Sequence, residues 1–124
     1  YKMAHKHGPG RLIVIPGGDG YSIMWPEGGE KKVYWWHEGS AITPPNMWYH
    51  QHFNVSEEPI RYVVLRRGNP ELTGRGRGDA STENPQIEFR DEDPAVWALF
   101  AKELTDRGYD PSFMDQYRNE APES

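Results

Sequence analysis

Short runs of β-forming residues, each closed by glycine or proline, set the strongest limit on how this 124-residue chain can fold. Turn residues that return about every ten positions are typical of small sandwiches and barrels, because strands this short must reverse direction repeatedly. We therefore expect a mainly β structure in the first two-thirds of the chain. The six runs span residues 11–15, 21–25, 32–36, 41–43, 47–53 and 60–65.

The C-terminal part of the chain carries a helical pattern. Asp93 suits a helix N-cap, and Pro94 suits the first helical position. From Val96 to Leu104, apolar residues recur at intervals of three and four, which gives the helix one apolar face. A second short helix is expected to begin near Asp110.

These patterns divide the chain into three parts. We expect the β structure in residues 1–66, a long exposed loop rich in glycine and arginine at 67–85, and a returning strand with helices at 86–124. The mass of 14.3 kDa allows one core of ordinary size. The predicted fold is therefore a β domain with a C-terminal α-helical extension.

The composition narrows the classes of function. The chain has no cysteine, which excludes disulfides and thiolate metal sites. Its net charge of -5 argues against a nucleic-acid partner, since the positive charge that neutralises phosphates is missing. No apolar run approaches the roughly 20 residues of a membrane span, and no signal peptide is visible. We expect a cytoplasmic protein with no membrane partner.

Four of the five histidines form two His-x-His pairs, His5 with His7 and His50 with His52. In a β-strand, residues two apart point to the same face, so each pair aims two imidazoles at one side of a sheet. If the two strands face each other, the imidazoles converge and can bind Fe, Mn, Ni, Cu or Zn. The alternative is a polar strand face that happens to carry histidine.

The residues around the second pair resemble a known motif. The second motif of the cupin superfamily, a family of small β-barrels, reads G-x5-P-x-G-x2-H-x3-N. Gly39, Pro45, His50 and Asn54 stand at four of its positions, and Met47 replaces the inner glycine. The resemblance implies a cupin-type barrel, or jelly roll, for the β part of the chain.

The first cupin motif is matched less completely. It has H-x-H followed three or four residues later by glutamate, and then by glycine. His5, His7 and Gly18 fit this pattern, but Arg11 and Leu12 occupy the positions where the glutamate is expected. A metal site of the usual cupin kind, with three histidines and one glutamate, would therefore lack its carboxylate here.

The resemblance covers residues 3–66 and implies a metal held by His5, His7 and His50. Three-histidine sites of this kind occur in gentisate-type ring-cleaving dioxygenases. Their aromatic-rich second motif is similar to residues 48–52, Trp-Tyr-His-Gln-His. The favoured cofactor is one Fe(II) ion, with Mn, Ni, Cu or Zn as alternatives.

The predicted function is that of a metal-dependent dioxygenase-type oxidoreductase acting on a small anionic or aromatic substrate. Arg11 would pair with the substrate's carboxylate, although a salt bridge at the barrel mouth is an equal alternative. His52 would orient a ligand or carry a proton. Two other functions stay open: a non-catalytic cupin that binds a metal or small ligand, and an isomerase or lyase whose metal acts as a Lewis acid.

The predicted barrel begins late in the chain, since cupins have two or three strands before the H-x-H strand. The first residue is Tyr1 rather than Met. Three explanations compete: an N-terminal portion in a longer parent chain, strand exchange in a homodimer, or a return of residues 87–89 to cover the open sheet edge. We favour the longer parent chain.

Overall fold

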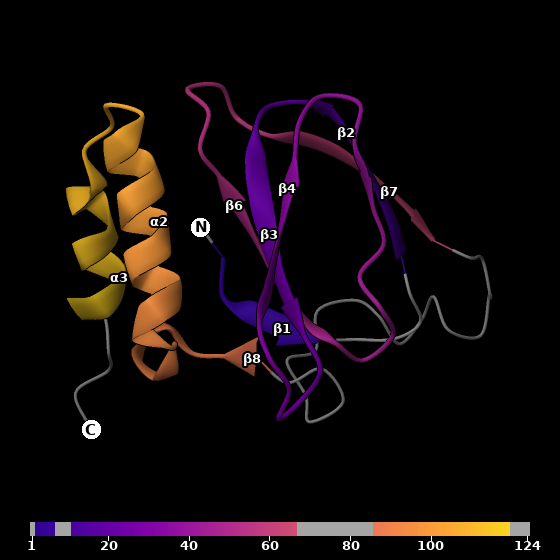
Figure 1. Cartoon of the computed structure of the whole chain (residues 1–124), viewed down its shortest axis with the longest axis horizontal. Helices are drawn as coiled ribbons and strands as arrows, with labels where there is room; N and C mark the ends of the chain where they lie inside the picture. The colour runs from indigo at the N-terminus through magenta and orange to yellow at the C-terminus, as the bar shows by residue number, and fades with distance from the viewer. Residues whose placement is uncertain (1, 7–10, 67–85, 120–124) are drawn as a thin grey trace. The chain divides into compact units, whose positions relative to one another are not determined.

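The computed structural model describes residues 2–6, 11–66 and 86–119. It divides the chain into two compact units, Tyr1–Gln86 and Ile87–Ser124. The first unit is built from strands and the second from short helices (Figure 1). A mainly β fold with C-terminal helices is therefore confirmed.

The strands form two sheets. The larger sheet has the order β4-β3-β6-β1-β8, and the smaller has the order β5-β2-β7. The pairs β1–β6, β3–β4, β3–β6, β2–β5 and β2–β7 are antiparallel, and Figure 1 shows β2 and β7 side by side. The strand bounds are β1 (Ala4–Lys6), β2 (Arg11–Gly17), β3 (Gly20–Trp25), β4 (Lys32–Trp36), β5 (Ala41–Ile42), β6 (Tyr49–Asn54), β7 (Arg61–Arg66) and β8 (Gln86–Ile87).

All six predicted β runs coincide with strands, to within two residues at each end. Among the described residues, the two sheets are not joined into a closed barrel. The predicted loop at 67–85 lies outside the described residues. The structure thus confirms the strands, whereas the jelly-roll barrel stays a prediction.

The sheet edge next to β1 is occupied by a strand from later in the chain. Gln86 and Ile87 form β8, which lies beside β1 in the sheet order. This is close to the return that residues 87–89 were expected to make as the third explanation for the late start. The longer parent chain and the exchanged dimer stay predictions.

A cluster of buried apolar side chains holds the first unit together. Alternation in β2 buries Ile13 and Ile15, while Leu12 on the opposite face is 38% exposed. Trp48, Ile60 and Val64 pack against the cluster and are partly buried. The cluster therefore joins side chains from both sheets. Its buried members are Ile13, Ile15, Met24, Trp36 and Ile42.

The second unit is helical as predicted. The Asp93 carboxylate accepts a hydrogen bond of 2.9 Å from the backbone N–H of Ala95 and so caps the first turn of α2. The apolar face of α2 buries Val96, Phe100 and Leu104. Within the described helices, none combines the length and apolar character needed to cross a membrane. The helices are η1 (Phe89–Asp91), α2 (Pro94–Asp106), η2 (Pro111–Met114) and α3 (Asp115–Asn119).

Gly20 allows a tryptophan from the neighbouring strand to lie across β3. It is paired with Trp36 of β4 and with Asn54 of β6. A Cβ atom at Gly20 would collide with the carbonyl oxygen of Phe53 and with the Trp36 ring. Only glycine fits this close approach, which brings the indole over the inner face of the sheet.

We predict that Gly20→Ala lowers the free energy of unfolding by about 2 kcal/mol or more, because the added methyl group overpacks a site bounded by backbone. Gly17→Ala is the matched control. A Cβ at Gly17 meets no atom within 4 Å, so its effect should stay within about 0.5 kcal/mol. Urea denaturation of both variants measures the difference. Equal losses in the two variants would contradict the close approach.

Candidate functional site

A tight turn sets the direction in which β6 enters the sheet. The carbonyl oxygen of Pro45 accepts a hydrogen bond of 3.2 Å from the backbone N–H of Trp48. Met47, the third residue of this turn, has φ of 61°, in the left-handed region that favours glycine. Alternation along the following strand then places His50 and His52 on one face.

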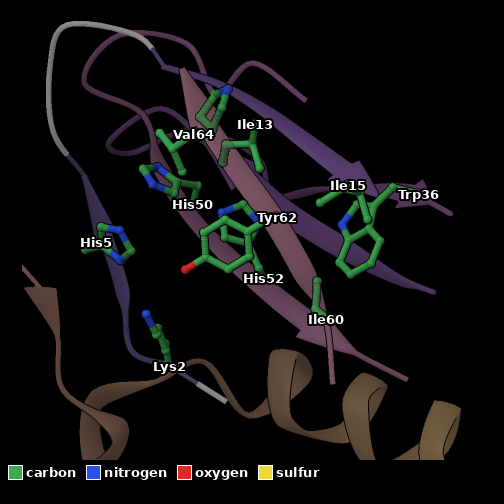
Figure 2. A pocket seen from close by; sticks show the side chains of 11 residues that line it. Lys2, His5, Ile13, Ile15, Trp36, His50, His52, Ile60, Tyr62 and Val64 are labelled. Atoms are coloured by element: carbon green, nitrogen blue, oxygen red, sulfur yellow. The ribbon is translucent and has the colours of Figure 1, made fainter. Parts of the chain in front are cut away.

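Strand register brings a third imidazole to this face. His5 of β1 is the direct partner of His50 in the antiparallel β1–β6 pair. The His5 and His50 ring centroids are 4.4 Å apart, and those of His50 and His52 are 5.6 Å apart. Figure 2 shows the three rings around one pocket. The structure therefore brings together one histidine of the first pair and both of the second.

Backbone carbonyls orient two of the three rings. Nδ1 of His5 lies 3.1 Å from the carbonyl oxygen of Met3, and Nδ1 of His50 lies 3.2 Å from that of Trp48. A carbonyl oxygen only accepts, so each Nδ1 carries the hydrogen and donates it. In the neutral rings, the lone pair is then on Nε2. This is the arrangement in which histidines bind metals through Nε2.

A hydroxyl group orients the third ring. Oγ of Ser22 lies 2.7 Å from Nδ1 of His52, its partner in the β3–β6 register. The indole Nε1–H of Trp36 donates a hydrogen bond of 2.9 Å to the same oxygen. Ser22 is fully buried and Trp36 is 4% exposed. The orientation of His52 is therefore set by neighbouring strands, not by its own backbone.

Side chains on the opposite face hold β1, and with it His5, against β6. Nζ of Lys6 lies 2.5 Å from Oε2 of Glu27 and 4.9 Å from the centre of the Tyr49 ring. The hydrogen bond to Glu27 raises the pKa of Lys6. Nε2 of the buried Gln51 donates to the carbonyl oxygen of the residue at position 2, at 2.7 Å. These contacts anchor a strand of only three residues.

The pocket is a cavity of about 180 Å³ between the two sheets. Its polar side chains are Lys2, Tyr62 and the three imidazoles, and no acidic side chain is among the described residues that line it. Figure 2 shows Tyr62 among the side chains that line this pocket. The cavity is therefore apolar in one part and polar in the other. The apolar lining consists of Ile13, Ile15, Trp36, Pro44, Ile60 and Val64.

Two of the predicted site residues cannot be placed. His7 lies outside the described residues, and so does the side chain of Arg11, which begins β2. Within residues 2–6, 11–66 and 86–119, no three histidine or acidic side chains are grouped so that they could hold a metal ion. A three-ligand site would therefore need a donor from outside the described residues.

The sequence interpretation missed two polar residues of the site. Ser22 is a polar side chain inside the apolar run 21–25, and a buried polar group needs a hydrogen-bond partner. The position of a polar residue within an apolar run could therefore have identified Ser22. Tyr62 is half exposed and shares its face of β7 with Val64, so strand alternation could have placed it in the pocket.

We predict that Trp36→Phe lowers the free energy of unfolding by about 1–3 kcal/mol, because the variant loses the bond to Ser22 and part of a buried ring. Trp35→Phe, one residue away and 52% exposed, should cost about 0.5 kcal/mol or less. Urea denaturation compares the two variants. A larger loss for Trp35→Phe would show that the indole bond contributes little.

Comparison with models of known protein families found no match to this chain, and comparison with curated proteins found none either.

Proposed function

We propose that this protein is a metal-dependent enzyme of the cupin type, with an Fe(II) dioxygenase-type activity on a small aromatic or anionic substrate. The observation that carries the proposal is the His5–His50 pair. The two rings lie 4.4 Å apart, and the hydrogens on their Nδ1 atoms are donated to backbone carbonyls. Both rings thus have the tautomer that binds a metal through Nε2.

The donor set suits a transition metal. Imidazole nitrogens bind Fe, Mn, Ni, Cu and Zn, and the chain has no cysteine to compete for them. His5 and His50 would supply two ligands. His7 would supply the third, and this assignment rests on the His5-x-His7 spacing alone.

The backbone at two motif positions supports the resemblance to cupins. Gly39, at the first glycine of the motif, has φ of 87°. Met47, at the inner glycine, has φ of 61°. A motif has glycine where the backbone must be left-handed. The left-handed φ of Met47 is therefore what the cupin motif predicts for that position.

The pocket favours a ligand the size of a single aromatic ring. A cavity of about 150 Å³ accommodates benzene, and this one measures about 180 Å³. Apolar side chains would pack on the ring. Lys2 and Tyr62 offer hydrogens to an anionic group, and the described lining has no carboxylate to repel it.

An iron ion bound by the histidines would supply positions for a chelating substrate and for O₂. The chain's own residues perform the remaining tasks. The phenol of Tyr62 and the amine of Lys2 would orient the substrate's anionic group. His52 would hold a hydrogen at the pocket surface, and the apolar wall would keep water from the ring.

A second candidate is a binding protein that uses the same pocket without a metal. It needs only the groups that line the pocket, with apolar side chains in one part and Lys2 and Tyr62 in the other. In that case the imidazoles would act only as hydrogen-bond partners of a small aromatic acid. The two candidates share the ligand class and differ in their need for metal and O₂.

We predict that protein purified without chelator holds one divalent metal ion per chain and that His50→Ala lowers this content about tenfold or more, because a ligand is lost. His37→Ala is the control, since His37 is exposed at a turn and bonded to the Glu38 carbonyl. Elemental analysis measures both variants. O₂ uptake with salicylate and gentisate then separates enzyme from binding protein.

The proposed enzyme function would be overturned by a metal-free wild-type protein, purified anaerobically, that gains no metal when Fe(II) is added. Salicylate binding that survives removal of metal by chelator would leave the second candidate in its place. Equal metal loss in His37→Ala and His50→Ala would show that the binding is not at this pocket.

We also predict that Val64→Phe weakens salicylate binding about tenfold or more, because the added ring fills the cavity. Val63→Phe is the matched control, one residue along β7 on the opposite face and 52% exposed. Its affinity should stay within about twofold of wild type. Calorimetric titration measures both, and equal losses would place the ligand elsewhere.

A further inference from the structure

The three pocket imidazoles do not hold their hydrogens in the same way. His5 and His50 donate Nδ1–H to carbonyl oxygens, so their neutral rings have the lone pair on Nε2. His52 faces a hydroxyl, which can donate as well as accept. The hydrogen position on His52 therefore depends on whether the hydroxyl of Ser22 donates to Nδ1 of His52 or accepts from it.

The indole of Trp36 determines the direction of the hydrogen bond between Ser22 and His52. An indole N–H only donates, so Oγ of Ser22 accepts from Trp36. The Ser22 hydroxyl has one hydrogen of its own, and Ser22 is fully buried, so this hydrogen needs a protein acceptor. Among the described residues, Nδ1 of His52 is the acceptor at hydrogen-bond distance, 2.7 Å away.

We propose that Ser22 is a positioning residue that donates to Nδ1 of His52 and so places the hydrogen of that ring on Nε2, opposite to His5 and His50. The three imidazoles then divide into two roles. His5 and His50 present lone pairs, which suit a metal ion. His52 presents an N–H, which suits an anionic oxygen of the ligand.

This division, which rests in part on the proposed function, deepens it by specifying the ligand. The substrate would carry an anionic oxygen for the Nε2–H of His52 in addition to the oxygen that meets the metal. A small aromatic acid with a second oxygen beside its carboxylate has both, and salicylate is the simplest probe. His52 would act by hydrogen bonding and not as a metal ligand.

The opposite assignment would have a clear cost. If Nδ1 of His52 donated to Ser22, two donors would point at one oxygen, and the hydroxyl hydrogen would lose the acceptor at 2.7 Å. A buried donor left without a partner is destabilising. This cost is avoided when Trp36 donates to Ser22 and Ser22 donates to His52, because both of these hydrogens then meet an acceptor.

Histidine tautomers can be read directly from ¹⁵N NMR of the ring nitrogens in ligand-free protein, at about pH 8.5, above the ordinary titration range of imidazole. We expect Nδ1–H for His5 and His50 and Nε2–H for His52 in wild type. In Ser22→Ala, His52 should become a mixture of both tautomers. Ser40→Ala is the control, because its hydroxyl bonds the backbone N–H of His37, outside the pocket.

An Nδ1–H tautomer for His52 in wild type would overturn the proposal, whether or not Ser22→Ala folds. An unchanged His52 tautomer in a folded Ser22→Ala would overturn the role of Ser22. These readouts need neither metal nor substrate, so the proposed function can fail without affecting them. The ligand assignment is tested separately: salicylate should shift the Nε2–H resonance of His52, and no shift under saturating salicylate would refute it.

Discussion

The pairing of β1 with β6 is the constraint on which the rest of the site depends. Strand β1 has three residues, too few for backbone hydrogen bonds alone to fix its register. Lys6 fixes it on the outer face through its contacts with Glu27 and Tyr49. A slip of one residue would turn His5 away from His50 and empty one side of the pocket. The imidazoles on one face of the sheet are thus held in register by ionic and aromatic contacts on the other face.

The fold was predictable where the sequence carries local signals. Turn residues delimit each β run, and Asp93 marks the start of α2, so these elements agree with the structure. The pairing of distant strands has no local signal, and the position of β8 beside β1 was only one of three explanations. Trp35 and Trp36 show the same limit. They are neighbours in the same β-forming run, yet Trp36 is buried and Trp35 is 52% exposed, because β4 is an edge strand.

The candidate site divides in the same way. Alternation places His50 and His52 on one face of β6, and this part required only the sequence. The meeting of His5 with His50 depends on register, and the bond from Ser22 to His52 depends on a neighbouring strand. Neither the register nor this hydrogen bond can be predicted from the spacing of residues along one strand. The sequence therefore indicated that His50 and His52 share one face, but not which atom of each ring faces the pocket.

In our proposal, that difference between the rings limits how many of them could bind a metal. For His52 to bind through Nε2, its hydrogen would have to move to Nδ1, where Ser22 already needs an acceptor. The fully buried hydroxyl would then lose its partner, at a cost of about 1–3 kcal/mol. His5 and His50 carry no such cost, since their Nδ1 hydrogens already meet carbonyls. The hydrogen bonds behind the pocket are thus the basis for our proposal that His5 and His50 would meet a cation and His52 an anion.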